Sequence, residues 1–159
     1  MKTEKDYEEF FALLNKHRVR YCIIGSYAVA FYSNPRYTKD VDLLVEPTRQ
    51  NAERLLRVLK EFGFGSLNLS ERDFANKGQI IQLGYEPVRI DLITSLSGLP
   101  FGQIWKNRKR GPYGRQKVNF IDLNSLIRSK KLSGRAQDIA DLEILTRVKR
   151  RLSRKRTET

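Results

Sequence analysis

The sequence predicts a single α/β (α+β) domain in which a mixed, mostly antiparallel sheet is flanked by helices. Amphipathic helical segments recur along the chain, short apolar strands lie between them, and two strand-like runs at residues 79–83 and 88–94 are joined by a turn. With 159 residues, 40% of them hydrophobic, the chain can form one core and is too apolar to be wholly disordered. We expect a domain over residues 1–146, followed by a basic C-terminal tail, 147–159.

The first part of the chain alternates helix and strand. In residues 4–17, apolar side chains recur at i, i+3, i+4 and i+7 and form one face of a helix. A buried strand is predicted at 20–24, and a Gly-Ser turn leads into a short helix at 27–32. This helix ends at Asn34-Pro35, because proline disfavours helical geometry at the residue before it. A second strand is predicted at 40–45.

The remaining elements follow from caps, breakers and apolar patterns. We expect a third helix that begins at Pro47-Thr48 and ends at Gly63, and then strands and turns over 64–94 with a hairpin turn at 84–87. A helical or irregular segment is expected at 101–108 and a late strand at 116–121. Two helices follow, one capped by Asp122 and a last one that starts near Gly134.

Composition excludes several classes of protein. No stretch is apolar and long enough to span a membrane, and residues 1–6 lack the apolar centre of a secretory signal. The single cysteine, Cys22, and the single histidine, His17, argue against a disulfide framework and a zinc enzyme. A cytoplasmic location, with no membrane partner, is the expectation.

The chain is strongly basic, with a net charge of +13. Seven basic residues lie between Arg147 and Arg156, and the rest of the chain is basic as well. A basic surface attracts RNA or DNA by releasing their counterions. The alternative, that such a tail mainly aids solubility, has about equal weight from the sequence.

Two carboxylates mark the strand at 40–45. Because successive side chains of a strand point to opposite faces, Asp40 and Asp42 share one face, and apolar residues occupy the other. Neighbouring carboxylates repel each other and are held together most readily by a cation. Oxygen ligands favour a hard ion such as Mg²⁺, which commonly accompanies phosphates. The alternative is an edge strand with solvated charges.

Two other features extend this interpretation. Gly25-Ser26 lies between a strand and a helix N-terminus, where backbone N–H groups can bind phosphate, although such a turn is often only a turn. Asp91 interrupts the apolar strand at 88–94. If that strand lies beside residues 40–45, three carboxylates converge and can hold two Mg²⁺ ions for displacement at phosphorus. Alternatively, Asp91 pairs with Arg89 or another neighbouring basic residue.

These residues resemble the nucleotidyltransferase superfamily of the DNA polymerase β type. The similarity includes Gly25-Ser26, Asp40-Val41-Asp42 and the later Asp91, with thirteen residues between the first two motifs. The flanking segments 36–39 and 48–63 and the run 130–141 resemble small stand-alone bacterial and archaeal members, including toxins of toxin–antitoxin systems.

The resemblance implies a role for each matched residue. Asp40, Asp42 and Asp91 would be catalytic and bind two Mg²⁺ ions, with Mn²⁺ as an alternative. The remaining candidates would bind the nucleotide, an NTP such as ATP; they are Gly25, Ser26, Arg36, Thr38, Lys39, Lys130 and Lys131. For the two C-terminal lysines, a solvated helix end is the slightly favoured alternative. Asp138 and Asp141 are expected to be structural.

The sequence therefore predicts transfer of a nucleoside monophosphate from an NTP to a hydroxyl acceptor, with release of pyrophosphate. The positive charge favours an RNA or tRNA end as acceptor, ahead of a protein or a small molecule. One alternative is a non-catalytic module that binds nucleic acid on the same fold. Another is a toxin that pairs with an antitoxin protein.

Overall fold

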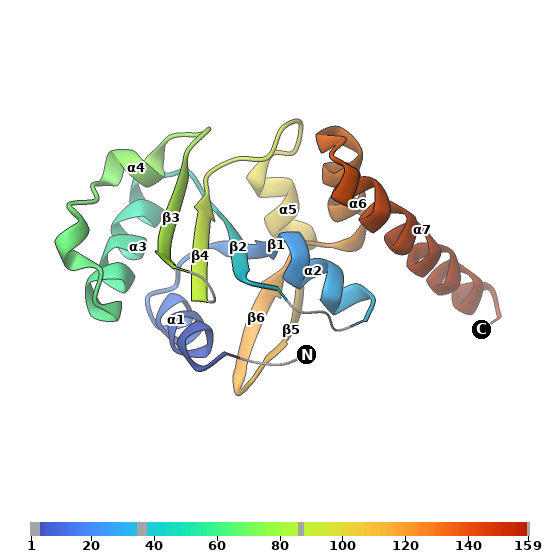
Figure 1. Ribbon diagram of the computed structural model, residues 1–159, viewed down its shortest axis with the longest axis horizontal. Coiled ribbons are helices and arrows are strands. Elements are labelled where there is room, and N and C mark those ends of the chain that lie inside the picture. Colours follow the sequence, from blue (N-terminus) through green and yellow to red (C-terminus); the bar gives the residue numbers. More distant parts are fainter. Residues whose placement is uncertain (1–3, 35–37, 86–87, 159) are drawn as a thin grey trace.

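The computed structural model describes residues 4–34, 38–85 and 88–158. A central sheet separates helices on its two sides, and the last helix extends away from the body toward the C-terminus (Figure 1). The helices of the described residues are α1 (Lys5–Lys16), α2 (Gly25–Tyr32), α3 (Arg49–Phe62), the 3₁₀ turn η1 (Gly65–Leu67), α4 (Glu71–Ala75), α5 (Phe101–Asn107), α6 (Leu123–Ser133) and α7 (Ala136–Thr157). The strands are β1 (Tyr21–Ile24), β2 (Asp40–Val45), β3 (Ile80–Tyr85), β4 (Val88–Ile93), β5 (Lys109–Tyr113) and β6 (Gln116–Phe120).

The six strands form one mixed sheet in the order β3-β4-β2-β1-β6-β5. Antiparallel pairing joins β1 to β2, β3 to β4 and β5 to β6, whereas β1 pairs with β6 and β2 with β4 in parallel. The predicted fold class, with a mostly antiparallel sheet, is confirmed. The parallel β2–β4 pair, formed by segments more than 40 residues apart, organises the site described below.

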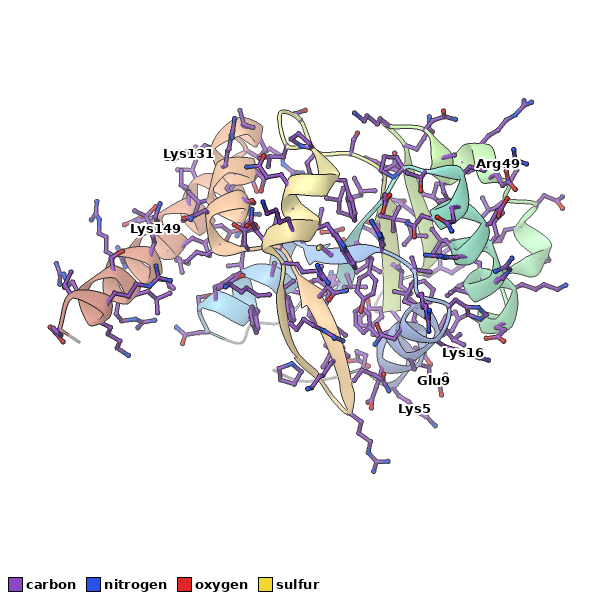
Figure 2. All side chains as sticks on the ribbon, turned by 180° about the vertical axis from the view of Figure 1, so that it is seen from behind. Lys5, Glu9, Lys16, Arg49, Lys131 and Lys149 are labelled. Atoms are coloured by element: carbon purple, nitrogen blue, oxygen red, sulfur yellow. The ribbon has the colours of Figure 1, made fainter. Side chains whose placement is uncertain are left out.

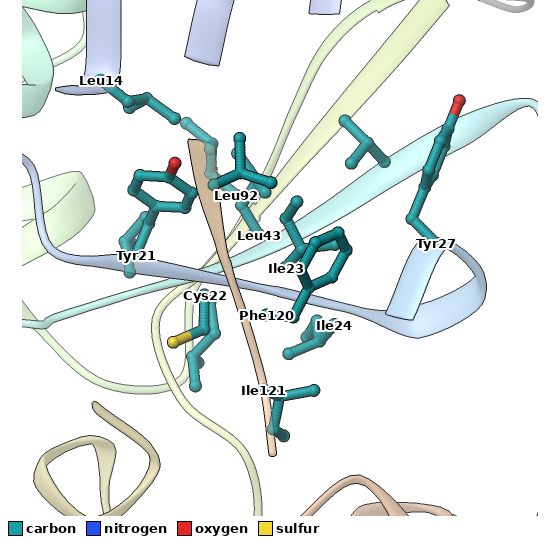
Figure 3. Close-up of a cluster of buried hydrophobic side chains, with 14 of the residues drawn as sticks. Leu14, Tyr21, Cys22, Ile23, Ile24, Tyr27, Leu43, Leu92, Phe120 and Ile121 are labelled. Carbon is teal, nitrogen blue, oxygen red and sulfur yellow. The ribbon is translucent and has the colours of Figure 1, made fainter. Parts of the chain in front are cut away.

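The core lies between the sheet and the helices that cover it. The side chains of β1 are all buried, and in β2 the face that carries Val41, Leu43 and Val45 is buried. Figure 3 shows Leu14 of α1 in the same apolar cluster as Leu43 and Leu92 of the sheet. Burial of this apolar area is the dominant favourable contribution to folding.

The expected helix ends at α3 and α6 are confirmed. The Thr48 side chain accepts a hydrogen bond from the Asn51 N–H (3.3 Å), and Gly63 ends α3 with a positive φ of 104°. Asp122 caps α6 by accepting from the Ser125 N–H (3.2 Å). These ends depend on local side-chain and backbone chemistry, which is why they can be read from the sequence.

Four expectations about secondary structure require correction. Helix α2 begins at Gly25, two residues earlier than predicted, so the Gly-Ser pair belongs to its first turn. Residues 64–94 contain η1 and α4 besides strands, and a capping box between Ser70 and Asp73 starts α4. Strand β5 was not predicted. Gly84 and Tyr85 of the expected turn belong to β3, and residues 86–87 lie outside the described residues.

Two further observations concern the C-terminus and the membrane. Helix α7 is continuous through residue 157, so the basic residues expected in a tail form its second half. Among the described residues, no helix combines the length and apolar character that crossing a membrane requires.

Candidate metal and nucleotide site

Three carboxylates converge where β2 and β4 pair. The parallel register sets Asp42 directly beside Asp91, and Asp40 lies two residues before Asp42 on the same face. One oxygen from each of the three carboxylates lies within 4.8 Å of the others. Asp91 is buried, whereas Asp40 and Asp42 are partly exposed, so the cluster opens to solvent on one side. The condition on which the convergence of the three carboxylates depended, that the two strands are neighbours, is therefore met in the structure.

Arg89 neutralises part of this negative charge. Its Nη2 atom donates hydrogen bonds to Asp40 Oδ2 (2.8 Å) and Asp91 Oδ2 (3.3 Å). The Tyr7 hydroxyl of α1 donates to the Arg89 carbonyl (2.9 Å) and holds this end of β4. Pairing of Asp91 with Arg89, an alternative to the site from the sequence, occurs within the cluster, so the arginine is part of it. The sequence signal for this role is the spacing of Arg89 and Asp91, because residues i and i+2 of a strand share a face.

The charge of Asp42 remains incompletely balanced. Burial, followed by the nearby charges of Asp40 and Asp91, raises the pKa of Asp42 from 3.8 to about 7. In addition, the Oδ1 atom of Asp91 is buried and makes no hydrogen bond, although it lies 3.2 Å from Arg89 Nε. A cation among the three carboxylates would relieve both costs. Oxygen-only ligands fit Mg²⁺ or Mn²⁺, so the residues present fit the divalent metal that the sequence implied.

Gly25 brings the start of α2 against this cluster. Its φ of +67° favours glycine, and a side chain there would collide with the Asp42 carboxylate, whose Cγ would lie 3.1 Å from the new Cβ. The first turn of α2 carries no acidic residue, and its N-cap residue, Ile24, supplies no side-chain cap. Ser26 lies in this first turn, and the N-terminal end of a helix carries partial positive charge that favours anions. An anionic group can therefore approach the carboxylates from this end of α2.

The loop before β2 contains three of the predicted nucleotide-binding residues. Thr38 donates its hydroxyl hydrogen to the Asp40 carbonyl (2.9 Å) and thereby orders the start of the strand. Lys39 is exposed beside Asp40. Arg36 lies outside the described residues. The roles of Thr38 and Lys39 toward a nucleotide stay predictions.

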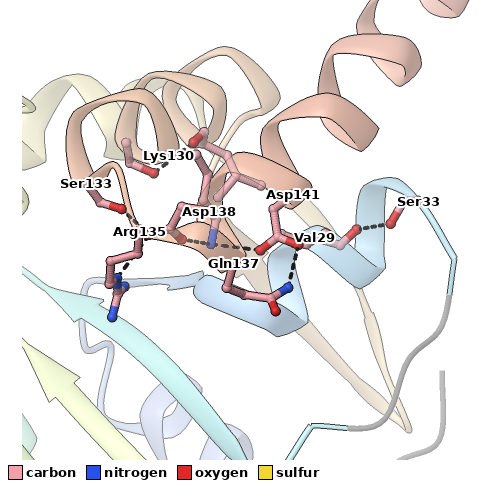
Figure 4. A network of polar contacts seen from close by, with 10 residues as sticks. Val29, Ser33, Lys130, Ser133, Arg135, Gln137, Asp138 and Asp141 are labelled. Carbon is pink, nitrogen blue, oxygen red and sulfur yellow. Dashed lines mark hydrogen bonds and ion pairs between the residues drawn. The ribbon is translucent and has the colours of Figure 1, made fainter.

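The two candidate lysines of α6 differ in environment. The side chain of Lys130 is 11% exposed, and its Nζ atom lies 2.9 Å from Asp138 Oδ1 and 3.1 Å from Asp141 Oδ2. Figure 4 shows this network at the junction of α6 and α7, with Asp141 beside α2. Lys131 is exposed on the last turn of α6. Lys130 therefore connects α6 to α7 through Asp138 and Asp141, the two aspartates expected to be structural. Its contact with a phosphate stays a prediction.

The Lys130 network is strongly ionised. Burial acts to raise the pKa of Asp138, but hydrogen bonds from Ser133, Lys130 and Arg135 outweigh it and lower the pKa to about 2. Asp138 therefore keeps its charge at neutral pH, and the network lies at the junction of α6 and α7, where α7 packs against α2.

A family model and several solved structures are similar to this chain. The family described as nucleotidyl transferase of unknown function (DUF2204) matches residues 3–158. No curated protein sequence matches the chain.

Several solved structures share the fold at low sequence identity. An antigenic nucleotidyltransferase-like protein from Paracoccidioides brasiliensis superposes with a TM-score of 0.54 and 18% identity over 88% of this chain and 74% of that one. The lincosamide antibiotic adenylyltransferase LnuA, solved with lincomycin, gives a TM-score of 0.54 and 13% identity over 92% and 98% of the two chains. The protein ANT(2")-Ia, solved with adenylyl-2"-tobramycin, gives a TM-score of 0.54 and 11% identity over 87% of this chain and 84% of that one.

Proposed function

The chain belongs to the DUF2204 family of nucleotidyl transferases, and we propose that it transfers a nucleoside monophosphate from an NTP to a hydroxyl acceptor in a Mg²⁺-dependent reaction. The observation that carries this proposal is the convergence of Asp40, Asp42 and Asp91 beside the first turn of α2. Carboxylates next to an anion-binding helix end combine the two features that a metal–triphosphate complex requires.

Each part of the site has a role in this reaction. The three carboxylates would hold the divalent metal, which when bound supplies charge neutralisation at the triphosphate and a more acidic acceptor hydroxyl. The backbone N–H groups of Gly25 and Ser26 would orient the phosphates. Asp91 accepts the proton of the acceptor hydroxyl as its oxygen bonds to the α-phosphorus. The bond from the α-phosphorus to the bridging oxygen breaks, and pyrophosphate leaves.

An RNA end is the acceptor we favour. The support is the net charge of +13, which attracts a polyanion more strongly than a neutral molecule. A small hydroxyl compound is the second candidate, because LnuA and ANT(2")-Ia, which share the fold, were solved with an antibiotic and an adenylylated antibiotic, respectively. The acceptor classes are separated by the products that become labelled.

The test is incubation of the purified protein with each α-labelled NTP, Mg²⁺ and either total RNA or cell lysate, followed by separation of RNA, protein and small molecules. We expect label on RNA, and none with Asp42→Asn. The matched control is Asp6→Asn, which removes an exposed carboxylate of α1 and should retain activity.

Two results would contradict the proposal. Transfer by the Asp42→Asn protein at the wild-type rate would show that the carboxylate cluster is not the catalytic site. Absence of label with every NTP, together with RNA binding that is insensitive to Mg²⁺, would favour the non-catalytic binding module.

A further inference from the structure

The C-terminal half of α7, residues 147–156, forms a basic arm. It contains seven lysine and arginine residues and no acidic one. The last buried side chain of α7 is that of Val148, and every later described residue is exposed. Figure 1 shows this part of the helix extending beyond the rest of the molecule, and Figure 2 shows side chains projecting from it in several directions. The arm therefore contributes little to the core.

Five of the seven basic side chains of the arm form no ion pair among the described residues. Within the part of the chain that the structure describes, ion pairs involve neither Lys149, Arg150, Arg151, Arg154 nor Lys155. Arg147 pairs with Glu143, and both side chains are exposed. Like charges four residues apart, such as Arg150 and Arg154, disfavour an isolated helix. An exposed helix with this pattern is stabilised when a polyanion neutralises it.

The arm also forms one wall of a groove of about 500 Å³. Lys149 and Arg156 of the arm line it, and Lys109 of β5 and Arg128 of α6 line the other side. The acidic side chain in its lining, Asp122, already accepts a hydrogen bond as the cap of α6. The groove is therefore basic on both walls, as a surface that follows a phosphate backbone needs to be.

The arm is connected to the catalytic cluster through α2. Helix α7 starts beside α2, and α2 starts against Asp42. The arm begins 11 residues after Ala136, which corresponds to about 16 Å along the helix axis. A polynucleotide is long enough to contact both the arm and the carboxylates, whereas a small hydroxyl compound is shorter than this length of helix.

We propose that the basic arm and its groove bind the phosphate backbone of the RNA acceptor and so select polynucleotides over small hydroxyl acceptors. That the bound RNA is an acceptor rests on the proposed function. RNA binding by the arm can be tested without any transfer reaction. The partner is a polynucleotide because the surface combines five cations that form no ion pair among the described residues with a second basic wall, and phosphates repeat along a nucleic acid.

The test compares two variants of equal net charge, +9 each. The arm variant carries Lys149→Gln, Arg150→Gln, Arg151→Gln and Arg154→Gln. The control variant carries Lys5→Gln, Arg57→Gln, Lys60→Gln and Arg72→Gln, which are exposed, lie outside the arm and make no ion pairs among the described residues. Glutamine keeps high helix propensity, and circular dichroism verifies folding.

The measurement is fluorescence anisotropy of a labelled single-stranded RNA oligonucleotide in EDTA without NTP, repeated over a range of salt concentrations. If each of the four arm residues contacts one phosphate, the salt dependence (log K against log salt) becomes less steep by about 3, and affinity falls about 100-fold near 0.15 M salt in the arm variant. The control variant should bind nearly as the wild type does. In the transfer assay, the arm variant should show a raised KM for RNA at unchanged kcat and unchanged KM for NTP.

Three results would overturn the assignment. Equal loss of affinity in both variants would mean that only net charge matters, and wild-type affinity in the arm variant would place RNA elsewhere. Stronger binding to vesicles of equal parts phosphatidylserine and phosphatidylcholine than to RNA at the same phosphate concentration would assign the arm to an anionic membrane surface. Failure of transfer with any acceptor would refute the proposed function alone, because RNA binding by the arm is measured separately.

Discussion

Replacing Asp42 with asparagine should stabilise the metal-free protein at ~pH 8 while abolishing nucleotidyl transfer. The carboxyl group of Asp42 is placed against Asp40 and Asp91, and its burial makes ionisation costly. Asparagine has nearly the same size and carries no charge. The substitution therefore removes the repulsion without opening a cavity, and gain of stability with loss of activity separates a functional role from a structural one.

The magnitude follows from the pKa of Asp42. Its pKa is about 7 in the native state and 3.8 for an ordinary aspartate, so the unfolded chain releases this proton at lower pH than the native protein does. Ionisation of Asp42 therefore lowers the free energy of unfolding progressively as the pH rises from about 4 through about 7. The full difference corresponds to about 4 kcal/mol at 1.36 kcal/mol per pKa unit. Because the variant also loses attraction to Arg89, we expect a gain of about 2 kcal/mol, or about 6 °C in Tm.

The assay is thermal unfolding followed by circular dichroism in EDTA at ~pH 5 and ~pH 8, with Asp6→Asn as the control. The stability difference between Asp42→Asn and wild type should shrink toward the lower pH. Excess Mg²⁺ should raise the Tm of the wild type and leave that of the variant nearly unchanged. The reasoning is refuted if Asp42→Asn is no more stable than wild type at ~pH 8, or if both proteins show the same pH dependence.

Three further substitutions test the site and its support. Gly25→Ala should lower stability by about 1–2 kcal/mol, from its positive φ, and reduce kcat/KM at least about tenfold by displacing Asp42; steady-state kinetics at wild-type level would contradict this. Arg89→Met should lower the Tm in EDTA and tighten Mg²⁺ binding about tenfold in a calorimetric titration, because two carboxylates lose their counter-charge; unchanged Mg²⁺ affinity would count against it. Lys130→Met should cost about 3 kcal/mol in urea unfolding, because buried carboxylates lose their partner, whereas Lys131→Met should change stability by less than about 0.5 kcal/mol.

Local chemistry made much of the fold predictable. The apolar periodicity that predicted α1 and α3 depends only on residues within a few turns of each other. The helix ends at Thr48 and Gly63 depend on a side-chain acceptor and a positive φ at single positions. Strand β5 escaped prediction for a local reason, because it contains Gly111 and Pro112, which are unusual in strands. The sheet accommodates these residues because β5 is an edge strand. The short helix α4 also carries a local start signal, the capping box between Ser70 and Asp73.

The division between sequence and tertiary structure is clearest at the carboxylate cluster. Strand periodicity alone places Asp40 and Asp42 on one face, because alternation is a property of a single strand. Whether Asp91 joins them depended on the parallel pairing of β2 with β4, and a register shifted by one residue would have turned it to the opposite face.

Tertiary packing also decided the state of the charges. The sequence determined that Arg89 and Lys130 are cations, but not that one bridges two carboxylates and the other lies between two buried aspartates. It determined a run of basic residues near the C-terminus, whereas the structure made that run the exposed half of α7. Periodicity and capping act within a few residues and are written in the sequence, while burial, register and the pairing of distant charges arise only when remote segments pack together.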